Sequence, residues 1–357
     1  MNTKIKILLV ILFCFVLTGC SLQIGGLGKK KIDDSGVYIS YDRGATWVQK
    51  VEYLNVGPNR SFFKTAQSTF IKQDQNDPKA IYLGTLQDGL LYSFDGGAGW
   101  QKTLFGKGAI NDIAIDNKYR CTMYGAVSTK IYKTEDCGRN WRQIYTDGNN
   151  KIVKSVLVDY INNNKIYLAT TDGRFYKSDD FGISWKMIKS FDDETIVKAT
   201  MNPKNSDKIY VCTEKDGIFK TENGGIDWFN ITDKIDLGDK KSNSNVGVYK
   251  DFEFDLSKED AFFYANKYGI FYSKDGGETW SVLKLLTKPS SVTIYSIASN
   301  PKNSNEIYYT IPNKIYKTLD GGNTWITKTL PTKQAPIDML VDSVNQDSIF
   351  MAVKLMD

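Results

Sequence analysis

The sequence contains no histidine among its 357 residues. Without an imidazole, the chain cannot build a Ser-His or Cys-His nucleophile system or a metal site with histidine ligands. Cysteine is also scarce, with five in the whole chain, so a disulfide scaffold is excluded and the fold must depend on a hydrophobic core. These absences predict neither a metal site nor a cofactor.

An excess of charge of either sign is also missing. The formal net charge is +5 at pH 7, and removal of a leader that contains Lys4 and Lys6 would lower it to +3. Such a small net charge does not indicate a nucleic acid as partner.

Long apolar runs are absent except for "ILLVILFCFVL" (7–17), which is too short to span a bilayer comfortably. With two lysines before it, this run is typical of a secretory signal. The "LTGC" that follows resembles the bacterial lipobox, whose cysteine is lipidated before the leader is removed. We therefore expect a lipoprotein signal peptide over 1–19, a lipidated Cys20 and a tether over 20–35. More than one acyl chain would hold the protein stably to the cell membrane or the outer membrane, on its extracytoplasmic side. The alternative is a non-lipidated signal with an incidental cysteine.

One pattern, Ser/Thr-x-Asp-x-Gly-x-x-Trp, occurs seven times, with Asn223 in place of the Asp once, and includes every tryptophan of the chain. Its carboxylate can accept hydrogen bonds from the backbone of a tight turn, its glycine allows positive φ, and its tryptophan packs the turn down. We expect these residues to be structural. They are Asp42 and Trp47, Asp95 and Trp100, Asp136 and Trp141, Asp180 and Trp185, Asn223 and Trp228, Asp275 and Trp280, and Asp320 and Trp325.

Short β-type segments surround each box. A typical unit reads "IVKATMN", "KIYVCT", "GIFKT" and then the box, with turn residues between the segments. Four short strands per unit of about 45 residues predict the blades of a β-propeller. Two strands near the N-terminus (36–40 and 47–51) and two near the C-terminus (336–342 and 348–355) would complete one shared blade, which leaves no exposed edge. We therefore predict an all-β, seven-bladed propeller of four-stranded antiparallel blades over 36–357.

The box pattern resembles that of the Asp-box (BNR) repeat propellers. The unit "NPKNSDKIYVCTEKDGIFKTENGGIDW" is similar to the photosystem II assembly and stability factor branch, which shares its unit with sortilin-type receptors and xyloglucanases. The resemblance implies a structural box at the blade periphery and a non-catalytic binding or assembly module for a protein partner in the cell envelope. Nothing in the sequence indicates a phototrophic host.

The glycosidase branches of the same resemblance imply the main alternative, a carbohydrate-binding or carbohydrate-cleaving surface protein. Sialidases would require an arginine triad, but two of the six arginines here, Arg43 and Arg139, lie inside boxes. Xyloglucanases resemble two propellers that face one another, whereas this chain supplies one. A hydrolase needs two carboxylates at a defined separation, and acidic residues are too plentiful here to nominate a pair. We therefore expect no catalytic residue.

Binding residues are expected at the start of the inner strands and in the long connection 51–64. Propeller loops surround a central channel, and ligands favour such concave mouths. The connection combines aromatic residues with arginine, a mixture favoured at protein interfaces. The alternatives are hydrated channel residues and, for one of the two phenylalanines, burial at the start of the first inner strand. The candidates are Tyr53, Arg60, Phe62, Phe63, Lys64, Lys154, Lys198, Lys250 and Asp251.

Cys121 and Cys137 fall opposite each other in a hairpin that turns near residues 128–130. The expected compartment allows a disulfide between them, although geometry could forbid it. Cys212, inside "KIYVCTE", is expected to be a small buried residue.

Overall fold

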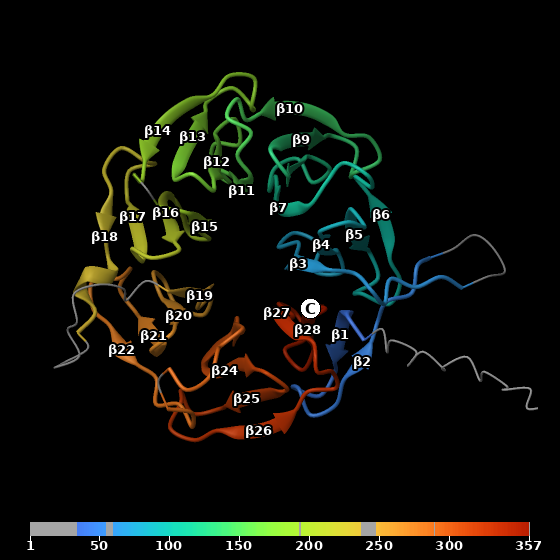
Figure 1. Ribbon diagram of the computed structural model, residues 1–357, viewed down its shortest axis with the longest axis vertical. Coiled ribbons are helices and arrows are strands. Elements are labelled where there is room, and N and C mark those ends of the chain that lie inside the picture. The colour runs from blue at the N-terminus through green and yellow to red at the C-terminus, as the bar shows by residue number, and fades with distance from the viewer. Residues whose placement is uncertain (1–33, 55–59, 193, 237–247, 289, 357) are drawn as a thin grey trace, which may run out of the picture. The chain divides into compact units, whose positions relative to one another are not determined.

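A computed structural model describes residues 34–54, 60–192, 194–236, 248–288 and 290–356. These residues form seven four-stranded antiparallel sheets arranged around a central axis (Figure 1). The prediction of a seven-bladed, all-β propeller is confirmed. The expected signal peptide, Cys20 and most of the tether lie outside the described residues.

Each blade begins with the strand nearest the axis. Blade 1 holds β3 (Ser68–Gln73), β4 (Ile81–Thr85), β5 (Leu90–Ser93) and β6 (Gln101–Thr103); blade 2 holds β7 (Ile110–Ile115), β8 (Met123–Val127), β9 (Lys130–Thr134) and β10 (Arg142–Thr146); blade 3 holds β11 (Val153–Val158), β12 (Ile166–Thr170), β13 (Arg174–Ser178) and β14 (Lys186–Ser190). Blade 4 holds β15 (Ile196–Asn202), β16 (Asn205–Thr213), β17 (Ile218–Thr221) and β18 (Phe229–Asn230); blade 5 holds β19 (Tyr249–Phe254), β20 (Phe262–Asn266), β21 (Gly269–Ser273) and β22 (Ser281–Val282); blade 6 holds β23 (Ser296–Asn300), β24 (Asn303–Ile311), β25 (Lys314–Thr318) and β26 (Ile326–Thr329). A short 3-10 helix, η1 (Thr232–Lys234), follows blade 4.

Blade 7 is shared between the two ends of the chain, as the sequence predicts. Its inner strands are β27 (Ala335–Val341) and β28 (Ile349–Lys354), and its outer strands are β1 (Gly36–Ser40) and β2 (Val48–Gln49). β1 pairs with β28 from Gly36 opposite Val353 to Ser40 opposite Ile349. This pairing closes the ring, because every blade then has its full set of four strands.

The hydrophobic core consists of seven clusters, each formed by facing surfaces of adjacent blades. The second strand of each blade is buried on both faces, which explains its continuous apolar and aromatic sequence, such as "IYLAT" in β12. Tyrosine and phenylalanine fill the widening space between blades; Tyr124, Tyr167 and Tyr210 are almost completely buried. The core therefore lies between the blades and leaves the axis open.

The Asp-box turns make the hydrogen bonds that the sequence predicts. In the first box, the Thr46 amide donates to Asp42 Oδ1 (2.8 Å), and the Gly44 amide donates to Ser40 Oγ (2.7 Å). The equivalent amide bond recurs in the other six boxes; their acceptors are Asp95, Asp136, Asp180, Asn223, Asp275 and Asp320. Hydrogen bonds to the carboxylate lower the pKa of Asp42 to about 2.

The box tryptophans pack in the interfaces between adjacent blades, which we call seams. Trp141 packs with the cluster between blades 1 and 2, and its indole N–H donates to Thr103 Oγ1 of the preceding blade (2.9 Å). Trp280 and Trp325 donate in the same way to backbone carbonyls of the preceding segment. The prediction that the boxes are structural therefore agrees with their contacts.

In the described part of the chain, none of the helical segments is long and apolar enough to cross a membrane.

Candidate functional site

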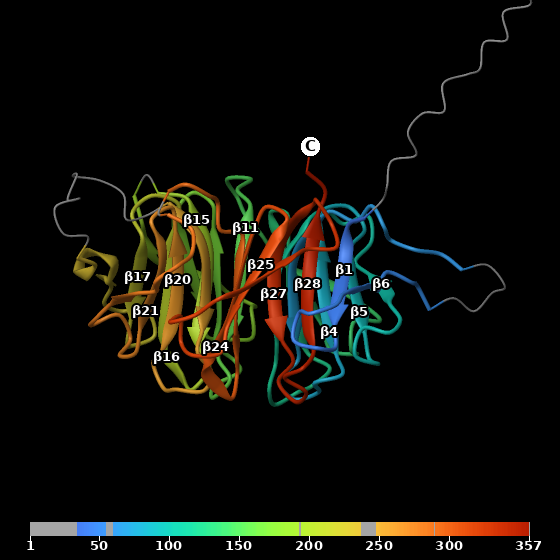
Figure 2. The ribbon, with the colours of Figure 1, turned by 90° about the horizontal axis from the view of Figure 1, so that it is seen from below.

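The propeller has two different faces, which follow from the up-and-down order of the strands. The turns between first and second strands and the Asp-box turns lie on one face, which we call the box face. The hairpins between second and third strands and the connections between blades lie on the opposite face, which we call the connection face (Figure 2). The C-terminal strand β28 ends on the connection face, where the inner strands also begin.

The inner strands carry a repeated β-bulge near the connection face. The register shifts at the same place in blades 1, 2, 3, 4, 5 and 7. A bulge inserts one unpaired residue and redirects the side chains around it. The inserted residues are Thr69, Asn111, Lys154, Val197, Lys250 and Ile337, and all of them line a central cavity of about 380 Å³. The bulges therefore explain how polar residues reach the channel from strands that are otherwise apolar.

In blades 2, 3, 4, 5 and 7 the residue after the bulge is polar and forms a belt of hydrogen bonds to the next blade, whereas blade 1 has Phe70 at this place. The Val156 amide donates to Asp112 Oδ2 (3.1 Å), and the Ala199 amide donates to Ser155 Oγ (2.9 Å). The Ile297 amide donates to Asp251 Oδ2 (2.7 Å). These side chains satisfy backbone groups of the next inner strand, so their first role is to join blades.

The belt continues around the ring in blades 4 and 7. The Lys198 ammonium donates to the Phe252 carbonyl (2.8 Å), and the Ile71 amide donates to Asp338 Oδ2 (3.0 Å). The second contact links blade 7 to blade 1 and so reinforces the closure of the ring. Lys72, which the sequence reasoning did not select, bonds to Asp112 and to the Ile113 carbonyl in blade 2.

Burial and charge shift several pKa values in the channel. Burial raises the pKa of Asp338 to about 6 and raises that of Glu253 well above its usual range. Burial alone would lower the pKa of Lys198, but the carboxylates of Asp251 and Asp338 reverse the effect and keep the ammonium charged. Burial lowers the pKa of Lys154, which makes no ion pair in the described part of the chain.

The channel candidates therefore divide into two groups. Lys154 and Lys250 line the cavity at the inserted positions and remain available to a ligand. Lys198 and Asp251 lie 3.7 Å apart and are engaged with backbone groups of neighbouring blades, so the structure assigns them to the belt. The sequence placed all four at the channel; it did not reveal the bulges that separate their roles.

The long connection, which carries the other candidates, runs at the outside of the ring (Figure 1). Glu52 pairs with Phe62, and Tyr53 pairs with Trp100 at the start of the outermost strand of blade 1. The Leu54 amide donates to the Trp100 carbonyl (2.7 Å). Because this segment covers it, Trp100 is fully buried, whereas the other box tryptophans are half-exposed.

Phe63 is buried and Phe62 is exposed, in agreement with the alternative that one of the two phenylalanines is buried. The Phe63 side chain is 3% exposed and packs against Trp100 and Tyr53, with ring centroids 5.7 and 5.3 Å away. It also does not begin the first inner strand, which starts at Ser68. Phe63 is instead the anchor that holds the connection to the core.

The remaining residues of this segment face solvent. Phe62 is 44% exposed, and the Lys64 ammonium lies 4.8 Å from the centre of its ring. Arg60 is exposed and pairs with Glu52 at 3.3 Å, and Leu54 is also exposed. We call Leu54, Arg60, Phe62 and Lys64 the rim patch; Tyr53 is half-buried beneath it.

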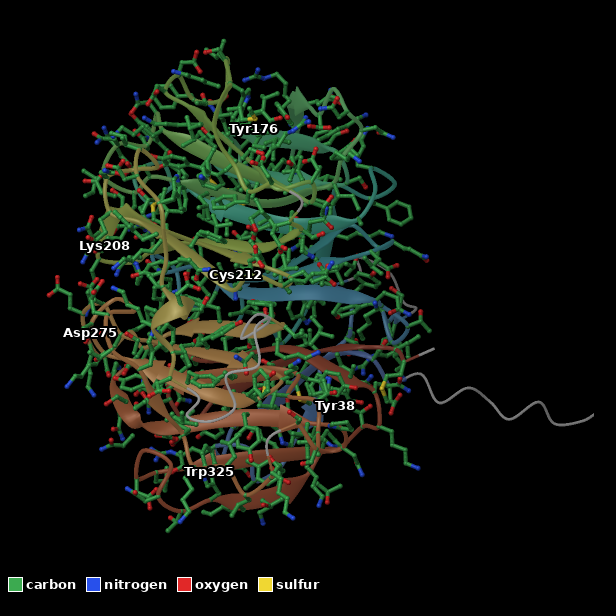
Figure 3. The ribbon with its side chains drawn as sticks, turned by 60° about the vertical axis from the view of Figure 1, so that its left-hand side comes forward. Tyr38, Tyr176, Lys208, Cys212, Asp275 and Trp325 are labelled. Carbon is green, nitrogen blue, oxygen red and sulfur yellow. A yellow bond between two sulfur atoms is a disulfide. The ribbon has the colours of Figure 1, made fainter. Side chains whose placement is uncertain are left out.

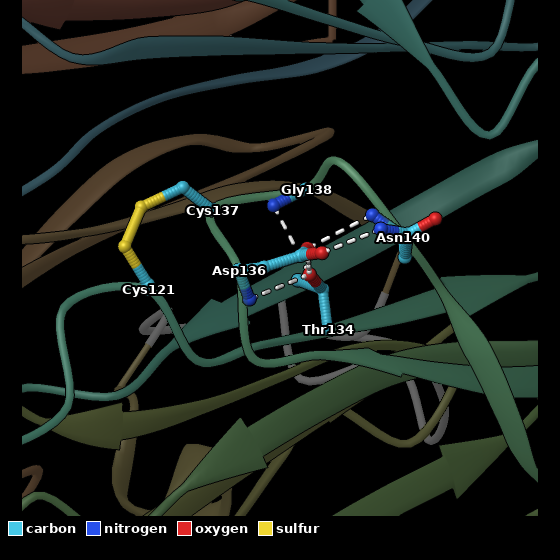
Figure 4. The surroundings of a disulfide bond; sticks show 6 residues. All are labelled: Cys121, Thr134, Asp136, Cys137, Gly138 and Asn140. Atoms are coloured by element: carbon cyan, nitrogen blue, oxygen red, sulfur yellow. Dashed lines mark hydrogen bonds between the residues drawn. A yellow bond between two sulfur atoms is a disulfide. The ribbon is translucent and has the colours of Figure 1, made fainter.

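A disulfide joins Cys121 and Cys137 in blade 2 (Figure 4). The Cys137 amide also donates to the Cys121 carbonyl (3.0 Å), a backbone contact that recurs between turn and box in the other blades. Cys212 is fully buried inside blade 4 (Figure 3). Among the described residues, no cluster of acidic or cysteine side chains could hold a metal ion.

Comparisons with known proteins agree with the fold. The BNR/Asp-box repeat matches residues 271–282, which include the box of blade 5. A GH74 xyloglucanase from Xanthomonas campestris superposes with a TM-score of 0.65 at 12% identity over 81% of this chain, which spans about half (51%) of the enzyme. No curated protein sequence matches the chain.

Single-propeller proteins are similar over their whole length. The structure of YCF48 bound to a D1 peptide has a TM-score of 0.60 at 16% identity and covers 86% of this chain and 100% of its own. YCF48 from Cyanidioschyzon merolae has a TM-score of 0.61 at 13% identity and covers 80% of this chain and 95% of its own. With seven boxes in sequence and seven blades in space, the chain has the fold of a seven-bladed β-propeller, and one of its boxes matches the BNR/Asp-box repeat.

Proposed function

We propose that this propeller is a non-catalytic binding module, held at the outer side of a bacterial membrane by a lipid on Cys20, that docks a protein partner through the rim patch. The observation that carries the proposal is the pairing of a buried anchor with exposed contact residues. Phe63 and Trp100 fix the connection to blade 1, while Arg60 and Phe62 face solvent.

The composition of the rim patch fits a protein interface. Aromatic and arginine side chains contribute most to binding energy in such interfaces, where a few positions each cost more than about 2 kcal/mol on truncation. Arg60 is paired only at the surface, where an ion pair is weak, so a partner carboxylate could replace Glu52 at little cost. A rigid base also reduces the entropy lost on binding.

The channel supports binding rather than hydrolysis. Three of its carboxylates, on Asp112, Asp251 and Asp338, accept hydrogen bonds from the backbone of the next blade. A carboxylate that holds the ring together is poorly placed to exchange protons with a substrate, since glycoside hydrolysis needs two free carboxyl groups on either side of the bond. The similar structure of YCF48 with a bound D1 peptide supports peptide binding as a use of this fold.

The test combines Arg60→Ala with Lys64→Ala in the lipid-anchored protein. Envelope proteins that crosslink to the wild type would be identified by mass spectrometry, and their recovery compared with that of the variant. We expect a loss of at least tenfold for the true partner, with an unchanged melting temperature because both side chains are exposed. The matched control is Lys107→Ala, an exposed lysine in the connection between blades 1 and 2. Full recovery by the double variant would place the docking surface elsewhere.

A further inference from the structure

A second concave site lies on the box face, in the seam between blades 2 and 3. It has a volume of about 540 Å³, within the range of ~300–1000 Å³ in which proteins bind small molecules. The cavity at the equivalent seam, between blades 6 and 7, has a volume of only about 160 Å³. The fold therefore does not require a groove of this size. Its lining includes Tyr119, Lys133, Glu135, Arg142, Phe181 and Ile183, and we call it the seam groove.

Two exposed aromatic rings line the seam groove from different blades. Tyr119 belongs to the turn between β7 and β8 and is 52% exposed, and Phe181 belongs to the box of blade 3 and is 40% exposed. Ile183, beside Phe181, is 82% exposed. The Lys118 ammonium lies 5.5 Å from the centre of the Tyr119 ring, and the exposed parts of both rings could be covered by a flat or ring-shaped apolar surface.

The charges of the seam groove balance. Lys133 is buried at its floor, where its ammonium lies 2.8 Å from Glu135 and 5.6 Å from the centre of the Phe181 ring. The buried Asp116 accepts hydrogen bonds from the Tyr119 amide and from Asn163, whereas Arg142 makes no ion pair in the described part of the chain. The groove therefore has two cationic side chains and two anionic ones, which offer hydrogen-bonding groups. Their charges cancel, so the groove has no net charge that would attract an ionic ligand.

The disulfide of blade 2 braces this groove. Cys121 lies in the turn that carries Tyr119, and Cys137 lies in the box that carries Glu135 (Figure 4). Asp136 further fixes the box through its hydrogen bonds with Thr134 and Asn140. The disulfide therefore joins two segments of the blade 2 wall, and a wall that is held rigid loses less entropy when a ligand binds.

We propose that the seam groove binds a neutral oligosaccharide. The C–H faces of pyranose rings would cover Tyr119 and Phe181. The sugar hydroxyls would form hydrogen bonds with Arg142 and Glu135, because hydrogen bonds to charged groups are the stronger ones. An apolar peptide would bury the Arg142 guanidinium without a partner. A phosphate or a uronic acid would meet the Glu135 carboxylate. The site is independent of the rim patch, which lies on blade 1.

The test is a calorimetric titration of the purified protein with neutral hexasaccharides of the cello-, xylo-, manno- and malto- series. We expect saturable binding of at least one series, weakened at least tenfold by Phe181→Ala or by Tyr119→Ala. The matched control is Phe94→Ala, which removes an exposed aromatic residue of the blade 1 box and should leave binding unchanged. Replacing both cysteines with serine should weaken binding a few-fold, provided that the melting temperature shows the variant still folds.

The absence of binding by all four series would overturn the proposal, as would undiminished binding by both aromatic variants. Tighter binding of an acidic oligosaccharide, of inorganic phosphate or of an apolar peptide at the same residues would also overturn it. Arg60→Ala should not affect these titrations, so the failure of one site can be distinguished from the failure of the other.

Discussion

A cysteine pair at positions 43 and 347 should close the ring covalently. In blade 2 the disulfide joins two residues whose backbones share a hydrogen bond, and Cys137 has a φ of 59°. In blade 7 the same two places are held by Arg43, with a φ of 57°, and Asp347. The Arg43 amide donates to the Asp347 carbonyl (2.8 Å), and the side chains form an ion pair at 2.6 Å. Arg43→Cys combined with Asp347→Cys would therefore copy an arrangement that the fold already contains.

The expected gain follows from the length of the loop that the bond closes. In the chain-entropy description, a loop of 304 residues contributes about 5.7 kcal/mol, whereas the 16-residue loop of the native disulfide contributes about 3.1 kcal/mol. The lost ion pair is exposed and contributes at most about 1 kcal/mol. Glu306, 3.7 Å from Arg43, keeps its hydrogen bonds with Asn300 and Tyr308. The net gain is about 4.7 kcal/mol, or ~7 °C for a domain of roughly 320 residues.

A matched control separates loop length from local geometry. Asn305 and Gly321 occupy the same two places in blade 6, where the Gly321 amide donates to the Asn305 carbonyl (3.0 Å) and φ is 71°. Asn305→Cys with Gly321→Cys closes a 16-residue loop and should gain about 2.6 kcal/mol less. Calorimetry of the oxidised and reduced proteins would measure both, with mass spectrometry to verify the bonds. Equal gains for the two oxidised variants would refute the loop-length reasoning.

Three further predictions concern the boxes, the belt and the tether. Because hydrogen bonds lower the pKa of Asp320 from 3.8 to about 2, the unfolded chain binds more protons below pH 4, and stability should fall as pH drops from 4 to 2. Asp320→Asn, which copies the natural Asn223 box, should make this fall less steep in acid titrations followed by tryptophan fluorescence. Ser155→Ala should cost about 1–3 kcal/mol in urea unfolding, because it leaves the buried Ala199 amide without an acceptor; no loss would refute the belt as a stabilising feature. Cys20→Ala should move the protein from the membrane to the soluble fraction, and unchanged membrane association would argue against lipidation.

The fold could be predicted because the decisive signal is local and repeated. Each box specifies one turn through its own side chains, and seven copies specify the number of blades. The shared blade followed from counting strands at the two ends. The opposition of Cys121 and Cys137 followed from hairpin register, which is fixed by a turn only a few residues long.

The site could be predicted only in part, because it depends on contacts between distant residues. The position of Lys154 and Lys198 at the channel follows from strand order, but the belt depends on a backbone amide some 44 residues further along the chain. The burial of Phe63 depends on Trp100, which is 37 residues away and lies at the start of the outermost strand of blade 1. The seam groove is likewise lined by Tyr119 and Phe181 from two different blades, and no local sequence pattern indicates that they lie near each other.

The shared blade also sets the timing of folding. β1 is made among the first strands, but its partner β28 is made roughly 300 residues later, which takes ~15–60 s of synthesis at ~5–20 residues per second. During that interval the apolar strand "GVYIS" has an unpaired edge, and blade 7 cannot form on any part of the nascent chain. The last step of folding must therefore wait for the C-terminus, and two chains that fold side by side could exchange these strands before either ring closes.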